Sequence, residues 1–160
     1  MKTLIAAALL AAIFTGTAAA EPQFADYPAK TYLKGKPVLP KFTGDTAQFR
    51  TRIRNGMKDG PNFAGHFSLI EIGCGGSCIF TFLIDARTGK VVDFPLGGEE
   101  YYQLQMKYGL DSTLLQADWM DTSVGSYDTC IRRYYDISSG APKKVSEQSR
   151  KIEQSGYCGE

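Results

Sequence analysis

The chain has few of the residues that build metal centres. It contains a single histidine, His66, which excludes a site with several histidine ligands. Its four cysteines lack the paired C-x₂-C spacing of a zinc ribbon. No segment has the dense oxygen-ligand spacing of an EF-hand calcium loop. The sequence therefore predicts no metal site and gives no sign of another cofactor.

A complete catalytic constellation is also lacking. Ser77 sits in the sequence GGSCI rather than in the G-x-S-x-G elbow of serine hydrolases. The first two cysteines form a C-x₃-C pair between predicted strands, whereas a thioredoxin-type site needs C-x-x-C at the start of a helix. The adjacent Glu99 and Glu100 follow two glycines, which is typical of a solvated loop. An enzyme is therefore not the favoured interpretation.

The chain has no excess of positive charge and no long hydrophobic run after its first 20 residues. Without Lys2, 17 basic residues stand against 17 acidic ones. A generic nucleic-acid binder needs a basic excess, so we do not expect nucleic acid as a partner. A helix that spans a bilayer needs about 20 apolar residues, so no membrane span is expected once the first segment is removed.

Residues 1–20 have the composition of a secretory signal peptide. Lys2 gives a short positive start, residues 4–14 form an uncharged apolar stretch, and small residues follow. Ala18 and Ala20 stand in the A-x-A relation that a signal peptidase recognises, so cleavage would leave Glu21 as the new N-terminus. The sequence thus predicts an exported protein of the periplasm or the extracellular medium.

The four cysteines of the exported part, Cys74, Cys78, Cys130 and Cys158, indicate two disulfides. Three pairings exist, and we favour Cys74–Cys78 with Cys130–Cys158. The first closes a tiny loop whose glycines can take the positive φ of a tight bend. The second would tether the C-terminal tail to a strand.

The order of sequence patterns predicts an α+β fold: an antiparallel β-sheet meander with one N-terminal helix packed on it, stapled by disulfides. Residues 21–42 form a Pro-rich extended arm, and residues 43–160 form a single α+β domain. Phe49, Ile53 and Met57 recur every four residues and indicate a helix over about 45–57. Strands are expected at 66–72, 79–84, 91–94, 112–119 and 130–137, whereas 101–108 is either strand or helix and 143–153 is a final segment of unassigned type.

Binding residues are expected at the disulfide-closed loop and on exposed aromatic rings. Gly75, Gly76 and Ser77 form the loop. The Tyr pairs 101–102 and 134–135 would each place one ring on either face of a strand, so Tyr101 and Tyr134 are candidate contact residues. A core ring beside an inconsequential surface ring is an equal alternative for each pair.

His66 carries the rival interpretation, that of a small hydrolase. A single histidine can act as a general base beside a nucleophile. The alternative, which we favour, is that His66 anchors the start of a strand by a hydrogen bond to the backbone.

Three motifs resemble a group of small exported bacterial proteins of uncharacterised function: GPNFAGHF at 60–67, GCGGSC at 73–78 and DARTGKV at 85–91. This resemblance implies a shared fold and export. The arrangement of strand, disulfide-closed loop, strand and turn is similar to that of the Ivy family of periplasmic lysozyme inhibitors, whose loop enters the cleft of the enzyme. The loop here holds only Gly75, Gly76 and Ser77, so this second resemblance is one of topology.

We therefore expect an exported periplasmic binding protein that acts on a protein partner in the cell envelope. An inhibitor or immunity factor for a cell-wall hydrolase or a toxin is the leading hypothesis, because a closed loop has little freedom left to lose on docking. The alternatives are a small periplasmic hydrolase that uses His66, or a structural envelope protein.

Overall fold

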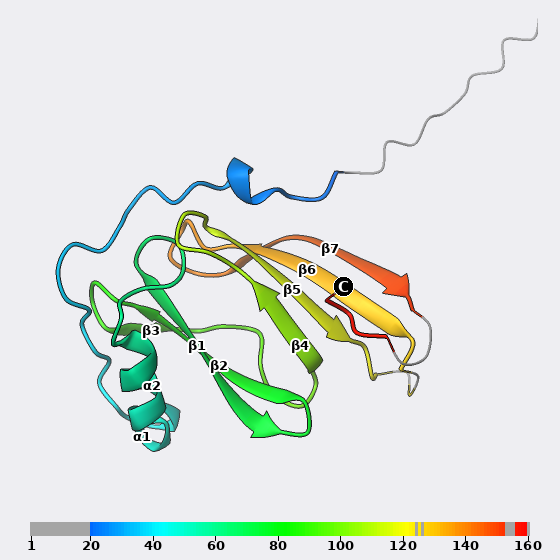
Figure 1. Ribbon diagram of the computed structural model, residues 1–160, viewed down its shortest axis with the longest axis horizontal. Helices are drawn as coiled ribbons and strands as arrows, with labels where there is room; N and C mark the ends of the chain where they lie inside the picture. Colours follow the sequence, from blue (N-terminus) through cyan, green and yellow to red (C-terminus); the bar gives the residue numbers. More distant parts are fainter. Residues whose placement is uncertain (1–19, 124, 126, 153–155, 160) are drawn as a thin grey trace, which may run out of the picture.

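The structure is a computed structural model that describes residues 20–123, 125, 127–152 and 156–159. The predicted signal peptide, apart from Ala20, lies outside the described residues. Seven strands and two short α-helices follow one another in two groups along the chain (Figure 1). The α+β class is confirmed, and so are both disulfide pairings.

Residues 21–42 run along the outside of the domain and are bonded to it in three places. Beyond the 3-10 helix η1 (Phe24–Asp26), the backbone at Tyr27 and Ala29 pairs with residues 111–113. Further along, Leu33 N donates to Gly65 O and Val38 N donates to Ala86 O, both over 2.8 Å. These backbone bonds hold the segment in place although its prolines prevent a regular element.

Helices α1 (Asp45–Gln48) and α2 (Arg50–Met57) occupy the range predicted for one helix, and they are separated at Phe49. Ile53 and Met57 of α2 are fully buried against the first sheet. Gly56 allows this close packing, because a Cβ there would lie 2.5 Å from Cδ1 of Ile70. The helical layer is thus attached to one face of the sheet by apolar contacts.

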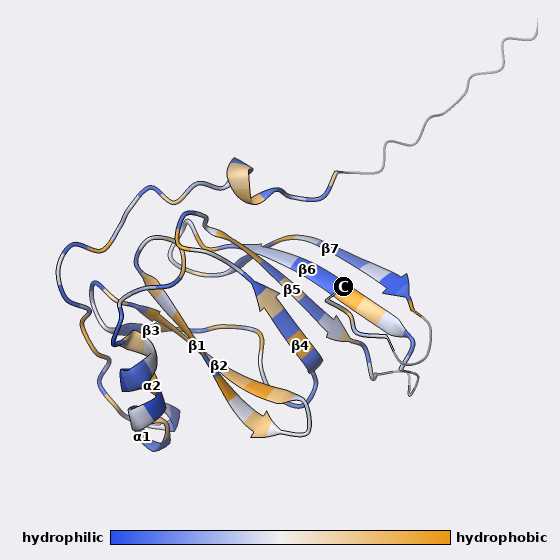
Figure 2. Cartoon of the chain, viewed as in Figure 1, coloured by the Kyte–Doolittle hydropathy of each residue, from blue (hydrophilic) through white to orange (hydrophobic). Residues whose placement is uncertain are grey.

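The first sheet contains β1 (Phe67–Gly75), β2 (Cys78–Asp85) and β3 (Lys90–Val92) in that order, all antiparallel. This is the predicted three-stranded meander. Along β1, alternate side chains enter two different cores: Phe67 and Leu69 face one, while Ile70 and Ile72 face α2. Hydrophobic residues therefore run almost without interruption along β1 and β2, as Figure 2 shows in orange.

The second sheet contains β4 (Tyr102–Lys107), β5 (Leu114–Met120), β6 (Thr129–Asp136) and β7 (Lys143–Lys151) in that order. All its pairings are antiparallel. The segment left open between strand and helix, 101–108, is thus strand β4. The predicted final segment, 143–153, contains the edge strand β7, and its residue 153 lies outside the described residues.

The main core lies between the two sheets. Phe67, Leu69 and Leu83 from the first sheet meet Leu115 and Trp119 from the second. The layers are therefore helix, first sheet and second sheet, and the outer face of the second sheet is polar. The Cys130–Cys158 bridge, with a Cα–Cα distance of 5.4 Å, ties the chain end to β6 inside a small separate cluster with Met120.

None of the helices in the described part of the chain is long and apolar enough to cross a lipid bilayer.

Candidate functional site

The bend between β1 and β2 forms an exposed tip at one end of the first sheet, residues 73–78. The Cys74–Cys78 disulfide closes it with a Cα–Cα distance of 5.2 Å. Gly75, Gly76 and Ser77 all have positive φ, which glycine adopts without strain and serine adopts at a cost. A Cβ placed on Gly75 or Gly76 would meet no atom within 4 Å, so there is open space where a side chain would project.

The tip is held in place by the chain that leads into β4. Gln103 N donates to Ser77 O over 3.2 Å, and Gly98 N donates to Ile79 O over 2.8 Å. A hollow of about 430 Å³ is lined by the tip together with Glu99 and Tyr102. The Tyr102 ring also stacks edge-on against Tyr127, with 5.6 Å between ring centroids, and Tyr127 is 57 % exposed. The tip is thus an exposed loop, fixed by backbone hydrogen bonds, beside the Tyr102–Tyr127 pair.

The two segments that form and hold the tip carry only negative charge. Glu71 lies on β1, and Glu99 and Glu100 precede β4. Residues 71–81 and 97–106 contain no lysine or arginine. A surface that receives this tip is therefore expected to be basic.

His66 lines a separate cleft of about 340 Å³, at the opposite end of β1 from the tip. Its Nδ1 lies 3.0 Å from Thr31 O. Because a carbonyl oxygen only accepts hydrogen bonds, Nδ1 is the donor in this contact, and the neutral tautomer that fits it has its lone pair on Nε2. The predicted backbone anchor is therefore present, and it also orients the ring beside a cleft.

Three hydroxyl groups of this cleft are bonded to acceptors other than His66. Ser138 Oγ donates to Asp136 over 2.6 Å, Thr113 Oγ1 donates to Asp136 over 2.7 Å, and Ser139 Oγ donates to Ala141 O. Burial raises the pKa of Asp136, but the hydrogen bonds from Ser138 and Thr113 outweigh it, and the net pKa lies below the usual value of 3.8. Among the described residues, then, no hydroxyl forms a nucleophile–base pair with the imidazole.

Asp85, which the β1–β2 register places opposite Phe67, is bound to Arg87 rather than to His66. Arg87 contacts it through Nε, Nη2 and the backbone N–H, at 2.9–3.2 Å. Burial raises the pKa of Asp85, but these bonds and the positive charge of Arg87 together lower it below the usual value. This carboxylate orients a turn and does not complete a Ser-His-Asp arrangement.

Neither of the two tyrosines predicted as contact residues lines the hollow beside the tip. Tyr101 is half-buried, edge-on to Trp119 with ring centroids 5.2 Å apart. Tyr134 is only 3 % exposed and its neighbour Tyr135 is also buried, so the expectation that one ring of this pair faces solvent is wrong. The ring of Tyr134 is enclosed by long polar side chains on the outer face of the second sheet.

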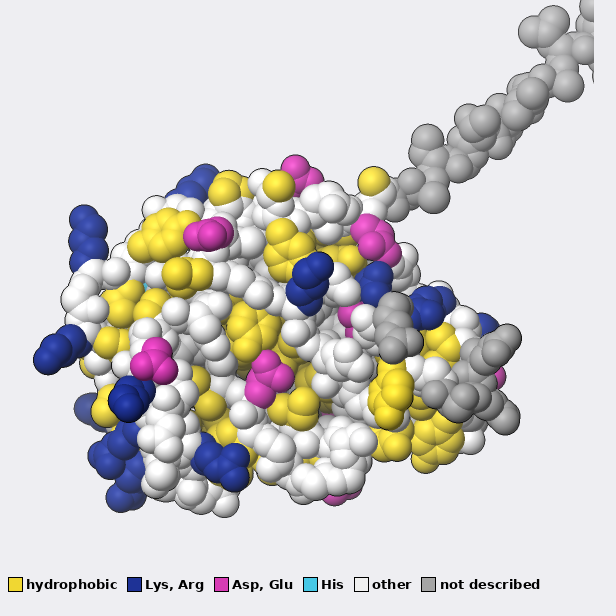
Figure 3. Space-filling view, in the orientation of Figure 1, with side chains coloured by type: hydrophobic (Ala, Val, Ile, Leu, Met, Phe, Trp, Pro, Cys, Tyr) yellow, Lys and Arg dark blue, Asp and Glu magenta, His cyan; other side chains and the backbone are white. Residues whose placement is uncertain are grey.

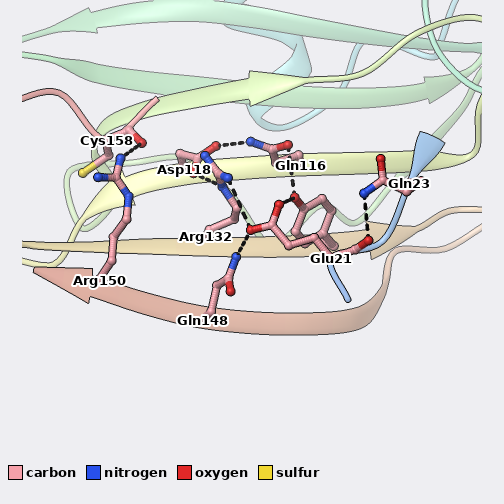
Figure 4. A network of polar contacts seen from close by, with 9 residues as sticks. Glu21, Gln23, Gln116, Asp118, Arg132, Gln148, Arg150 and Cys158 are labelled. Atoms are coloured by element: carbon pink, nitrogen blue, oxygen red, sulfur yellow. Dashed lines mark hydrogen bonds and ion pairs between the residues drawn. The ribbon is translucent and has the colours of Figure 1, made fainter. Parts of the chain in front are cut away.

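Those polar side chains form a network that runs across β5, β6 and β7 (Figure 4). Arg132 Nε donates to Asp118 over 2.6 Å, and Gln116 Nε2 donates to the other oxygen of the same carboxylate over 2.6 Å. Glu21 enters the network from the arm: its carboxylate accepts from Gln148 and lies 3.2 Å from the Tyr134 hydroxyl.

The hydrogen bond from Gln148 is the largest effect on the pKa of Glu21 and lowers it. Burial raises this pKa by less, and Tyr134 and Arg132 lower it further, so the net pKa lies below its usual value. Sequence reasoning missed this network. Its strand members alternate along β5, β6 and β7 (Gln116 and Asp118, Arg132 and Tyr134, Gln148 and Arg150), but only the strand register shows that the three pairs are adjacent.

Comparisons of the chain with protein-family models, curated proteins and solved structures found no match. The resemblance of residues 60–91 to small exported proteins, and the topological likeness to Ivy, therefore stay predictions.

Proposed function

We propose that this protein is an exported binding protein of the periplasm whose disulfide-closed tip docks into a protein partner of the cell envelope and inhibits it. The observation that carries the proposal is the tip itself: residues 73–77 are all exposed, yet a disulfide and two backbone hydrogen bonds fix their position. A projection that is ordered before docking loses little conformational entropy on binding. The two disulfides support an oxidising compartment.

The acidic surroundings of the tip narrow the class of partner. Glu71, Glu99 and Glu100 favour a basic receiving surface. Peptidoglycan carries carboxylates, and positive charge on an enzyme surface attracts such an anionic polymer. A cell-wall hydrolase is therefore the first candidate, and a basic effector toxin is the second.

The experiment measures hydrolysis of purified peptidoglycan by envelope extract with increasing amounts of this protein. Two variants probe the tip: Gly76→Asn adds a side chain that tolerates positive φ, and Glu99→Arg reverses a charge beside the tip. Asp93→Arg, an exposed carboxylate that follows β3, is the matched control. We expect the wild type and the control to inhibit hydrolysis and both tip variants to lose most of the inhibition. Absence of inhibition, or equal inhibition by all four proteins, contradicts the proposal.

A hydrolase that uses His66 is the second candidate, and the cleft beside the ring favours it. The Nδ1 contact with Thr31 O leaves the Nε2 lone pair as a base for a substrate or a water molecule. His66→Gln retains a side chain that can donate to Thr31 O and removes that base. Turnover of a peptidoglycan or ester substrate that disappears in this variant, with the melting temperature preserved, would support the catalytic role.

A further inference from the structure

Positive charge is concentrated in one part of this nearly neutral chain. Residues 30–60 carry eight lysines and arginines and only two acidic residues, whereas residues 61–160 carry nine lysines and arginines and thirteen acidic residues. Within the described residues, every cation that forms an ion pair lies outside 30–60: Arg87, Arg132, Arg133, Lys144 and Lys151. None of the eight cations in residues 30–60 forms an ion pair with a carboxylate of the described residues, so their charge is available to another molecule.

The fold brings several of these cations together with Lys90. The guanidinium carbons of Arg54 and Arg50 lie 5.1 and 6.0 Å from the centre of the Phe42 ring, next to Lys41. The chain just before Lys41 packs on the β2–β3 turn, where a Cβ on Gly89 would lie 2.5 Å from Leu39 O. Figure 3 shows Lys and Arg side chains gathered at this end of the molecule, over the helices and the arm.

Exposed aliphatic side chains lie among these cations. Val38, Leu39 and Val91 are 38–45 % exposed, and together with Lys41 and Lys90 they line a shallow groove of about 420 Å³. We define the basic face as Lys41, Arg50, Arg54 and Lys90 with these three aliphatic residues. Apolar side chains surrounded by lysine and arginine are typical of a surface that enters the headgroup region of a bilayer.

We infer that the basic face docks on a bilayer that contains anionic phospholipid. The cations would contact headgroup phosphates, and Val38, Leu39 and Val91 would reach the boundary of the acyl chains. Duplex nucleic acid offers phosphates but gives three exposed aliphatic side chains little to contact, so the lipid surface fits both features of the face. This inference is independent of the tip and of the inhibitory function proposed for it.

The test is sedimentation of the full exported chain with vesicles of phosphatidylcholine, with and without phosphatidylglycerol. We expect binding only to vesicles that contain phosphatidylglycerol, and weaker binding at high salt. Each lysine near an anionic surface changes the partition coefficient about fivefold, so Lys41→Gln/Lys90→Gln should lower it about 25-fold. Leu39→Ser should also lower it severalfold, which a purely electrostatic contact would not show.

The matched control is Lys143→Gln/Lys144→Gln, which removes two exposed lysines from the edge strand of the other sheet. It should change the partition coefficient less than twofold. Failure to bind phosphatidylglycerol vesicles, an equal loss in the control, or no effect of Leu39→Ser overturns the inference. Tighter binding to a short DNA duplex than to the vesicles also overturns it and would assign the face to nucleic acid.

Discussion

The two disulfides should differ in their contribution to stability, because they close loops of different length. Cys130 and Cys158 are 28 residues apart, whereas Cys74 and Cys78 are 4 apart. The chain-entropy relation gives about 3.6 kcal/mol for the long loop and about 2 kcal/mol for the short one. Cys130 and Cys158 are also buried with Met120, so replacing both by alanine leaves a small cavity that adds about 1 kcal/mol.

We therefore expect Cys130→Ala/Cys158→Ala to lower the free energy of unfolding by about 4–5 kcal/mol, and Cys74→Ala/Cys78→Ala to lower it by about 2 kcal/mol. Urea titration followed by circular dichroism measures both. At a slope of about 2 kcal/mol per M, the first variant loses about 2 M in its midpoint and the second about 1 M. The slopes must be fitted separately, because removing a cross-link exposes more surface in the unfolded chain.

An equal or larger loss from the short-loop variant would refute this reasoning, since loop closure could not then be the dominant effect. The comparison also serves the proposed function. If the short-loop variant stays folded, a loss of inhibition in it can be assigned to a looser tip rather than to unfolding.

Three further predictions concern buried contacts, and each has a matched comparison. Ile53→Ala should lower the free energy of unfolding by about 3 kcal/mol, because Ile53 of α2 is fully buried against the first sheet. Replacing the exposed Arg52 of the same helix by alanine should change it by less than about 0.5 kcal/mol, and similar values for the two variants in urea titration would contradict the packing of α2. Arg132→Ala should lower the free energy of unfolding by about 3 kcal/mol, because it leaves Asp118, which is only 4 % exposed, without its cation. Lys144→Ala should lower it by less than about 0.5 kcal/mol, because the Lys144–Glu147 pair is exposed. Because the pKa of Asp136 is lowered in the folded protein, its carboxylate contributes fully to stability above pH 3.8, the usual pKa, and this contribution is lost as the pH falls through the lower, folded-state pKa. Below about pH 4 the wild type should therefore lose more stability than Asp136→Asn. Parallel stability curves for the two proteins in acid would contradict this.

The first sheet and its disulfide loop follow closely from the sequence. In 66–84 the apolar residues are dense, the cysteines mark the bend, and the Asp-Ala-Arg-Thr-Gly turn ends β2, so each local signal agrees with the structure. The helix was also predicted over its range, because Ile53 and Met57 define its buried face. The periodicity did not indicate the separation of α1 from α2 at Phe49, whose ring packs at a tilt against Phe82 of β2 with centroids 5.5 Å apart.

The second sheet follows less well, for two physical reasons. Strand β7 (KKVSEQSRK) has almost no buried residue, so it lacks the alternation that marks a strand and exists through its pairing with β6. The burial of Tyr134 depends on Glu21, which is 113 residues away in sequence. Local sequence patterns cannot predict contacts between residues so far apart in the chain. For the same reason the sequence did not predict the network around Asp118 or the proximity of Lys41 to Lys90.

The arm contributes residues to the polar network, to the cleft beside His66 and to the basic face, but not to the tip. Glu21 joins the polar network of the second sheet, Lys30 and Thr31 line the cleft beside His66, and Val38 to Lys41 form part of the basic face. The tip instead depends on β1, β2 and the chain before β4. Deleting the arm would therefore alter three surfaces at once and could not separate the proposed lipid docking from the proposed catalysis at His66. Point substitutions on exposed side chains can separate them, because Lys41 and Lys90 take part in no ion pair among the described residues and carry no buried contact that the fold requires.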